Sequence, residues 1–392
     1  MKPPNPHNPK RNETFHPAHI PIDPNATLHP VPSRITGPLP FLNPTKAHYH
    51  LHSHPNIRFK WTSRNDRKGR HALSVSQPHT SDTTGSSSNT TTPRPTSSAH
   101  PILANMWKMA TYYPIWDLSF LIAYIFTLGS ILWILNAFFV FLPLVRPETG
   151  FAGESLYGGG ITAFIGATVF EVGSVLLLVE AVNQGRSGCF GWAVERVLEG
   201  DEGAGVRVEK GACLHAHRRK EQCGEVEKAE GRKWVWWPAR EELRRHYVHN
   251  LGFLASLAQF AGATIFWVAG FTALPGIYDR MSKPVTIVFY WTPQVVGGLG
   301  FIISGFLFMI ETQPTWWKPA PRTLGWWIGA LNLIGGVGFT LCPAFGYDSS
   351  SWAQYQACLS TFWGSWAFLI GSTLQWYESL EKFPVEISKA AR

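Results

Sequence analysis

The chain has 392 residues, a formal net charge of +8 and only five cysteines, so it is not a disulfide-rich secreted scaffold. Its mean hydropathy of −0.04 averages a polar N-terminal part and a strongly apolar remainder. This contrast excludes a uniform soluble protein.

The segment from residue 1 to 105 is polar and rich in proline. Most of the 29 prolines and 15 histidines precede residue 102, and a Ser/Thr/Pro tract covers residues 80–98. With few aliphatic residues and no period of 2 or 3.6, the segment cannot bury enough apolar surface to offset its chain entropy, which predicts a disordered cytosolic tail. It also lacks the apolar core of a signal peptide, so the first membrane helix is expected to act as the targeting signal.

Four histidines alternate within this tail, in the run HYHLHSH. They are His48, His50, His52 and His54. Alternating imidazoles can capture a soft divalent metal, whereas histidines in a flexible tail can equally bind nothing specific. The sequence is consistent with a metal site and with histidines that bind nothing specific.

Six apolar segments follow the tail, each close to the roughly 20 residues that cross the hydrocarbon of a bilayer. They are expected to be helices, because lipid offers backbone groups no other partner outside a closed barrel. The predicted spans are residues 118–144, 159–182, 251–274, 287–310, 324–344 and 361–380. Pro293 predicts either a kink in the fourth span or its true start.

The second, fourth and sixth spans share a pattern of Gly, Phe four residues later, a small residue seven later and Glu fourteen later. A spacing of seven is nearly two helical turns, so these positions lie along one face of each helix. Small residues there let helices approach closely in lipid, which predicts helix-packing seams. The seam residues are Gly166, Gly173, Gly297, Ser304, Gly364 and Gly371, and the acids are Glu180, Glu311 and Glu378.

The first, third and fifth spans also repeat. Each has Gly followed four residues later by an aromatic residue (Trp133, Phe266, Phe339), and each ends at a proline. The fold class predicted is therefore an all-α, polytopic membrane protein with six transmembrane helices as three repeated hairpins, in a pseudo-threefold or pseudo-repeat bundle. The expected parts are a tail (1–105), hairpins at 106–182, 251–311 and 312–392, the last with a short cytosolic C-terminus, and a charged cytosolic insertion at 183–250.

The distribution of Lys and Arg predicts the orientation. Only Arg146, Arg280 and Lys283 fall on one side of the predicted spans. All other basic residues fall on the opposite side, so both termini are expected to be cytosolic, in the plasma membrane or an endomembrane. Topology thus accounts for the basic net charge, and no nucleic-acid partner is expected.

The insertion at 183–250 carries two local patterns. Its middle brings together thiols and imidazoles, which are either zinc ligands at an unusual spacing or ordinary surface residues. Its end, 232–245, mixes basic and aromatic residues, which predicts a membrane-surface helix attracted to anionic lipid. The four metal candidates are Cys213, His215, His217 and Cys223.

A few polar residues fall within the spans. Glu171 lies near the centre of the second span, where it marks a polar cavity, ion path or proton relay, or else makes an interhelical hydrogen bond as a neutral carboxyl. Glu180, Glu311 and Glu378 either ring a cation entrance or anchor the helix ends at the interface. The amides Asn136, Gln259, Asn332 and Gln375 are expected to join helices. Cys342 and Cys358 flank the last external loop and are either a disulfide or, for Cys342, a buried small residue.

No Walker loop, GxSxG or HExxH motif is present, which makes an enzyme the third and least favoured hypothesis, and no cofactor is expected. Two functions from different classes remain. One is transport or conduction of a small solute or ion through the bundle. The other is a non-catalytic membrane organiser, in which the glycine seams assemble the bundle or a homo-oligomer and the tail and insertion recruit cytosolic partners.

Two runs, HNLGFLASLAQFAGATIFWVAGFTALPGIYD and FYWTPQVVGGLGFIISGFLFMIETQPTWWKPAPRTLGWWIGALNLIGGVGFTLCPAFG, resemble a group of fungal integral membrane proteins of unassigned activity. The similarity extends over about residues 117–378. The two-helix unit more faintly resembles the YrhK-like membrane domain. These resemblances imply a multi-pass membrane location and carry over no catalytic or binding residues.

Overall fold

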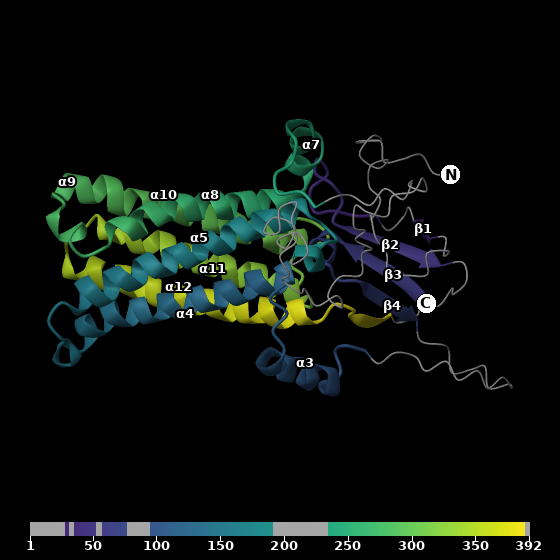
Figure 1. Cartoon of the computed structure of the whole chain (residues 1–392), viewed down its shortest axis with the longest axis horizontal. Helices are drawn as coiled ribbons and strands as arrows, with labels where there is room; N and C mark the ends of the chain where they lie inside the picture. The colour runs from purple at the N-terminus through teal and green to yellow at the C-terminus, as the bar shows by residue number, and fades with distance from the viewer. Residues whose placement is uncertain (1–27, 31–34, 52–56, 77–94, 191–233, 389–392) are drawn as a thin grey trace, which may run out of the picture.

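The computed structural model describes residues 28–30, 35–51, 57–76, 95–190 and 234–388. Within them, six long helices lie side by side, and a small five-stranded sheet covers one end of the helices (Figure 1). The molecule is mostly helical, as predicted.

The six long helices form a closed ring in the order in which they occur in the chain. Each packs against the next one, and the last returns to pack against the first. Their bounds are α4 Leu118–Val145, α5 Gly160–Val182, α8 Leu251–Thr272, α10 Thr292–Glu311, α11 Leu324–Gly346 and α12 Ser351–Leu380. A ring of this kind encloses a central axis.

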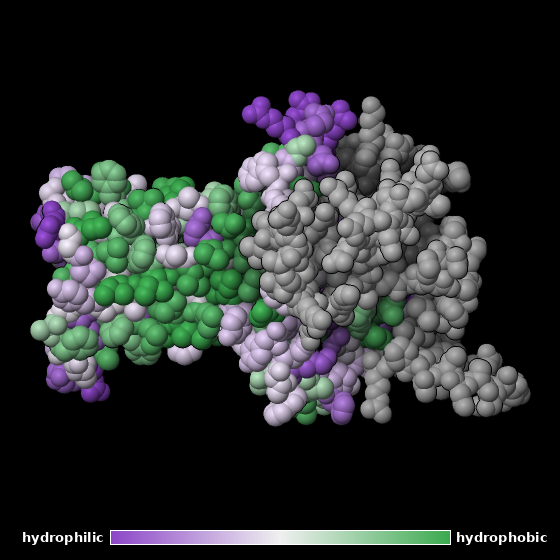
Figure 2. Space-filling model, viewed as in Figure 1, coloured by the Kyte–Doolittle hydropathy of each residue, from purple (hydrophilic) through white to green (hydrophobic). Residues whose placement is uncertain are grey.

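Five stretches of helix are long and apolar enough to cross a membrane. They cover Leu118–Val145, Glu154–Val182, Leu251–Thr272, Lys283–Glu311 and Leu324–Gly346. Apolar side chains cover the face of the bundle between its two ends (Figure 2), an extent of exposed apolar surface that marks contact with lipid rather than water. The chain is therefore a membrane protein. The sixth predicted span, α12, is not among these five.

One predicted helix boundary was wrong. α12 begins ten residues earlier than expected, because Ser350 caps it by accepting a hydrogen bond from Ala353 N at 3.3 Å, and the polar run that follows continues the helix. Of the two interpretations of Pro293, the structure agrees with the second, because this residue marks the start of a regular α-helix. It stands at the start of α10, directly after the helix α9 Lys283–Thr286 and the π-helical turn η8 Ile287–Trp291. A second π-helical turn, η3 Glu154–Gly159, leads into α5.

The expected disorder of residues 1–105 is wrong for the part of the tail that the structure describes. The sheet has the order β1-β2-β3-β4-β5. Its strands are β1 Leu28–Pro30, β2 Lys46–Leu51, β3 Ile57–Thr62, β4 Ala72–Ser76 and β5 Val385–Ser388. The first four are antiparallel neighbours, and the C-terminal β5 pairs with β4 in parallel.

A short alternation of apolar residues explains this sheet. Ala47 and Tyr49 in β2 and Phe59 and Trp61 in β3 face one side and form a small buried cluster. This period of two is the pattern of a half-buried strand, and it is brief enough to be hidden in a polar segment. The sheet pairs the N-terminal β4 with the C-terminal β5, so both ends of the described chain lie at the same end of the bundle (Figure 1).

Two short helices flank the junction of sheet and bundle. α3 Ala99–Thr111 lies beside the sheet end of the bundle (Figure 1) and is held there by Asn105, whose Nδ2 donates to Tyr377 O at 2.9 Å. α7 Arg240–Arg245 is only six residues long, shorter than the membrane-surface helix predicted for 232–245, and it projects away from the bundle.

One aromatic side chain from each long helix meets at the centre of the ring. These six buried residues, here called the aromatic layer, are Trp133, Phe170, Phe266, Phe301, Phe339 and Phe368. Trp133 and Phe339 contact edge to face with ring centroids 4.9 Å apart, as do Phe339 and Phe368 at 5.2 Å, whereas Phe266 is tilted against Phe301 and Phe339. Each of the six is the aromatic residue of its helix's repeated pattern.

Some of the patterned glycines allow close approach of the helices. A Cβ on Gly297 would lie 2.6 Å from Gly262 O, and one on Gly338 would lie 2.8 Å from Gly364 Cα. In the first pair of helices, Gly166 and Gly173 instead face aromatic rings. The small residues therefore set the spacing of α8 with α10 and of α11 with α12.

Candidate functional site

The connection between β3 and β4 enters the end of the bundle. It contains α2 Ser63–Arg67, which is capped by Thr62, whose side chain accepts from Asn65 N at 3.1 Å. Gly69 ends the turn with a φ of +59°, a conformation that favours glycine. This short capped helix places Arg64 and Arg67 on the side that faces the long helices, where both are buried.

Arg67 binds Glu311 in a bidentate ion pair. Its Nη1 and Nη2 lie 2.8 and 2.9 Å from the two carboxylate oxygens, and Ser63 Oγ donates to the same carboxylate at 2.7 Å. The guanidinium also stacks 5.1 Å from the ring of Phe308. Both side chains of the pair are almost completely buried, so the pair has no competing water and is held in one geometry.

Glu378 is paired with two arginines. Arg64 donates from Nε at 3.2 Å and from Nη2 at 2.7 Å, and Arg70 Nη1 donates at 3.0 Å. Arg70 also donates to Glu381 O at 2.8 Å and to Asn65. The carboxylate at the end of α12 is thus fully paired with the β3–β4 connection.

Glu180, the third repeated acid, has a weaker set of partners. It accepts a short hydrogen bond from Ser119 Oγ, and its other oxygen lies 3.7 Å from Arg67 Nε. Glu180 differs from the other two acids because of the residue opposite it. The second residue of α4 is Ser119, whereas the second residues of α8 and α11 are Gly252 and Gly325. A Cβ on Gly252 would overlap the Arg67 guanidinium, and one on Gly325 would lie 2.7 Å from Arg64 Nε. Glycine makes room for an arginine beside two of the acids, while Ser119 occupies that space beside Glu180.

Burial and neighbouring charges shift the basic groups of this connection. For Arg67, burial lowers the pKa, but attraction to Glu311 and Glu180 outweighs burial and holds the pKa above its ordinary value. Burial lowers the pKa of Arg70. Burial also lowers the pKa of Lys68 to about 8, and attraction to Glu180 offsets only part of this effect. The positive charge of Lys68 is therefore less stabilised by neighbouring carboxylates than that of Arg67.

These seven side chains are called the charged cluster. Its members are Arg64, Arg67, Lys68, Arg70, Glu180, Glu311 and Glu378. The sequence analysis identified the three acids but not their partners, because the basic run falls in a segment predicted to be disordered. The available signal was that three carboxylates converging at one end of a bundle need counter-charges, and that RNDRKGR stands between two short runs of alternating apolar residues.

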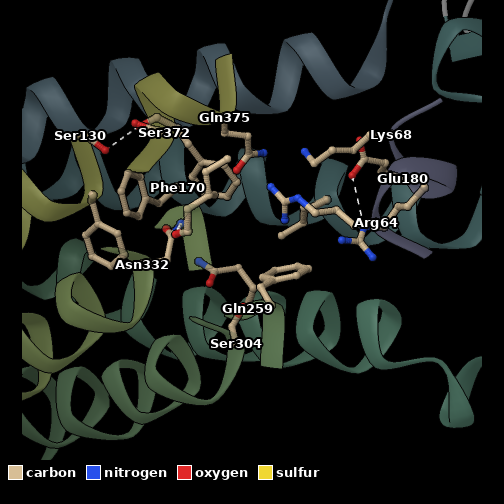
Figure 3. Close-up of a pocket in the computed structure, with 16 residues that line it drawn as sticks. Arg64, Lys68, Ser130, Phe170, Glu180, Gln259, Ser304, Asn332, Ser372 and Gln375 are labelled. Carbon is tan, nitrogen blue, oxygen red and sulfur yellow. Dashed lines mark hydrogen bonds and ion pairs between the residues drawn. The ribbon is translucent and has the colours of Figure 1, made fainter. Parts of the chain in front are cut away.

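A small cavity lies between the charged cluster and the aromatic layer. Its volume is about 40 Å³, and it is here called the inner cavity. Figure 3 shows Gln375, Asn332 and Gln259 around this space, with Lys68 pointing into it from the sheet end. Phe170 and Phe368 of the aromatic layer line its other side. The inner cavity is polar on one side and aromatic on the other.

A much larger cavity lies on the opposite side of the aromatic layer. This outer cavity has a volume of about 850 Å³ and is lined by residues of all six long helices. Its deepest walls are Trp133, Phe266 and Phe339, and its rim holds the exposed Asp279 and Asp348 in the loops remote from the sheet. The bundle axis therefore has two cavities with one layer of aromatic side chains between them.

The structure separates Glu171 from both cavities. Glu171 lies between α5 and α8, where its Oε1 accepts from Thr264 Oγ1 at 2.9 Å, and it is not in the lining of either space. By contrast, three of the four amides expected to join helices line the inner cavity, and Asn136 lines the outer one. Asn136 does bridge helices, donating to Gly159 O at 2.6 Å.

The cysteine and histidine candidates are only partly described. Cys342 and Cys358 are free thiols that both line the outer cavity, so the disulfide alternative is wrong. His48 and His50 lie in β2, and the part of the chain with described positions has no group of three metal ligands. His52, His54, Cys213, His215, His217, Cys223 and the first residues of the 232–245 segment lie outside the described residues.

Comparison with known protein families, with curated proteins and with solved structures finds no match to this chain. The resemblance to fungal membrane proteins and to the YrhK-like domain therefore stays a prediction. The features of this chain that bear on its function are the two cavities and the charged cluster.

Proposed function

We propose that this membrane protein transports a small solute along the axis of its helix ring. The observation that carries the proposal is the pair of cavities on one axis, separated by a single layer of aromatic side chains. Transport proteins hold their solute near the middle of the bilayer and open to one side at a time. Here the outer cavity reaches that depth from one end, while the charged cluster closes the other end.

The ring arrangement supports six spans rather than five. α12 packs between α11 and α4 over its length and is 30 residues long, so a bilayer crossed by its neighbours is crossed by α12 too. Its lower hydropathy has a local cause, because Gln354, Thr361, Ser372 and Gln375 face the two cavities rather than lipid. We infer three repeated hairpins, since each supplies two residues of the aromatic layer and one acid of the charged cluster.

The orientation predicted from the sequence assigns one end of the helix bundle to the cytosol and the other to the opposite side of the membrane. Among the described residues, all Lys and Arg other than Arg146, Arg280 and Lys283 lie at the end of the bundle that carries the sheet and the charged cluster, and this excess of positive charge favours the cytosol for that end. Arg146, Arg280 and Lys283 lie at the end that carries the outer cavity. The outer cavity therefore opens to the exterior or to an organelle lumen.

The walls of the outer cavity favour an uncharged solute. The only charged residues in its lining are Asp279, Lys283 and Asp348, and all three are exposed at the rim. The deeper walls are aromatic, with amide, hydroxyl and thiol groups, and the volume falls in the range of small-molecule pockets, about 300–1,000 Å³. A bare cation would find no carboxylate inside, so conduction of cations past Glu171 is not what this geometry supports.

The test is a flux measurement on the purified protein in liposomes. Stopped-flow swelling is recorded with glycerol, urea and sorbitol as probes, against protein-free liposomes. We expect faster swelling with at least one probe. A bulky maleimide should then abolish the increase by occupying the outer cavity through Cys342 or Cys358, and a variant with both cysteines replaced by Ser should be insensitive to the reagent.

Cys189 provides the matched control. It lies near the sheet end, is 1% exposed and is far from the outer cavity lining. Its replacement by Ser should leave both the flux and its block by maleimide unchanged. Swelling no faster than that of protein-free liposomes with every probe would reject transport of small uncharged solutes.

A further inference from the structure

Two buried cationic groups next to the inner cavity each have a nitrogen that makes no hydrogen bond. Lys68 Nζ and Arg67 Nε make no hydrogen bond, although Lys68 is 2% exposed and Arg67 is 1% exposed. Both residues line the inner cavity, and Lys68 points into it (Figure 3). A buried ammonium without a partner costs several kcal/mol, so a folded protein normally supplies one.

The charged cluster contains one more cation than anion. Arg64, Arg67, Lys68 and Arg70 supply four positive charges, and Glu180, Glu311 and Glu378 supply three negative charges, which leaves an excess of one positive charge. Among the charged neighbours of the cluster, Lys382 is paired with Asp117 at 2.7 Å, and Asp66, Arg186 and Glu381 do not line the inner cavity. The other residues that line the inner cavity are neutral.

The excess charge belongs to Lys68. Glu311 is bound by Arg67 and Glu378 is bound by Arg64 and Arg70. The free oxygen of Glu180 makes no hydrogen bond, but it lies 3.7 Å from Arg67 Nε and forms its ion pair there. The charged groups that face Lys68 are thus Glu180, Glu378, Arg64 and Arg67, and no ion pair within the cluster includes its Nζ.

We infer that the inner cavity is a binding site for one small monovalent anion of the halide class. Lys68 Nζ supplies the charge, Arg67 Nε supplies a second donor, and the side-chain amides of Gln259 and Gln375 supply neutral donors. The cavity volume of about 40 Å³ exceeds the roughly 10–15 Å³ needed for one water, so a monatomic anion fits and a larger oxyanion with its own hydration does not. This site is independent of the proposed transport and would be occupied whether or not a solute crosses the bundle.

The first test compares thermal unfolding in sodium chloride and in sodium gluconate at equal ionic strength and pH 7. Chloride is expected to raise the Tm of the purified wild-type protein by about 2–4 °C, since an anion that binds only the folded state stabilises that state. Lys68→Met should show the same Tm in both salts and should unfold in gluconate no earlier than the wild type. Lys60→Met, which removes a lysine from the sheet surface outside the cavity, should keep the chloride effect.

A second measurement needs no variant. Crystals of the wild-type protein grown in bromide should give an anomalous peak in the inner cavity within hydrogen-bond reach of Lys68 Nζ. Equal Tm values in the two salts, a chloride effect that persists in Lys68→Met, or density for water alone at Lys68 with no bromide peak would each overturn the anion site.

Discussion

Replacing Arg67 by Met is expected to lower the free energy of unfolding by about 3–5 kcal/mol, because it leaves Glu311 as a buried carboxylate without a partner. The pair is bidentate, at 2.8 and 2.9 Å, and neither side chain is more than 1% exposed. Since Arg67 belongs to the N-terminal segment and Glu311 to α10, the loss should also release the β3–β4 connection from the bundle. Unfolding of the purified protein, followed by circular dichroism against temperature or denaturant, measures the change.

Two variants separate this effect from the mere loss of a charge. Lys60→Met breaks an ion pair with Glu386 that lies on the surface, with side chains 23% and 56% exposed, so its cost should be about 0–1 kcal/mol. The double variant Arg67→Met/Glu311→Met removes both buried charges and should recover most of the stability lost in Arg67→Met. If Arg67→Met costs no more than Lys60→Met, the N-terminal segment is not held by the acid at the end of α10.

The protein should become more stable as the pH rises from 8 to 10.5 in halide-free buffer. Burial holds the pKa of Lys68 at about 8 in the folded protein, against 10.5 in the unfolded chain. Between these values the unfolded chain binds a proton that the folded protein has released, so the free energy of unfolding rises with pH, by about 3 kcal/mol in all. Below pH 8 Lys68 is charged in both states and this gain is absent.

The variant Lys68→Met identifies the group responsible. Lys46, whose pKa burial also lowers to about 8, contributes a rise of the same sign, so the variant should show a smaller slope rather than none. Thermal unfolding measured from pH 7 to pH 10 in gluconate gives both curves. If stability rises equally with pH in the wild type and in Lys68→Met, burial does not lower the pKa of Lys68.

The helical part of this fold could largely be predicted from the sequence, because its apolar segments are long. Apolar runs of twenty residues and the repeated Gly and aromatic positions led to the helices and to the six residues that form the aromatic layer. α12 was read less well, since its first ten residues are polar and its cavity-facing side chains lower its hydropathy. Boundaries set by a single capping serine do not show in an apolar run.

The acidic residues of the charged cluster were predicted from the sequence, but their basic partners were not. Glu180, Glu311 and Glu378 stand out because they recur at the same place in three helices, whereas their partners lie more than a hundred residues earlier and carry no repeat. The strands β2 and β3 each contribute only two residues to the buried cluster of the sheet, such as Phe59 and Trp61. A sheet of this size is stable because it packs on the bundle and pairs with β5, which local sequence does not reveal.

Glu171 was open to two interpretations. A lone acid in an apolar span is expensive and suggested either a path or an interhelical hydrogen bond, and the structure agrees with the hydrogen bond, since Glu171 lies between α5 and α8 with Thr264 as its partner. Rotation is set by packing of the patterned glycines and aromatics, and a residue five positions from Gly166 falls outside the face that those residues define. The residues that do line the axis are amides and hydroxyls, which composition alone does not distinguish from helix-joining residues.

Labelling of single cysteines from a defined side of the membrane tests the whole account most directly. In a background without the native cysteines, Ser349→Cys lies on the rim of the outer cavity and Lys60→Cys lies on the sheet. In sealed vesicles with their exterior face outward, a membrane-impermeant maleimide should label Ser349→Cys at once and Lys60→Cys only after permeabilisation. Labelling of both before permeabilisation, or of Lys60→Cys alone, would contradict a bundle that crosses the membrane with its outer cavity outside and its charged cluster in the cytosol.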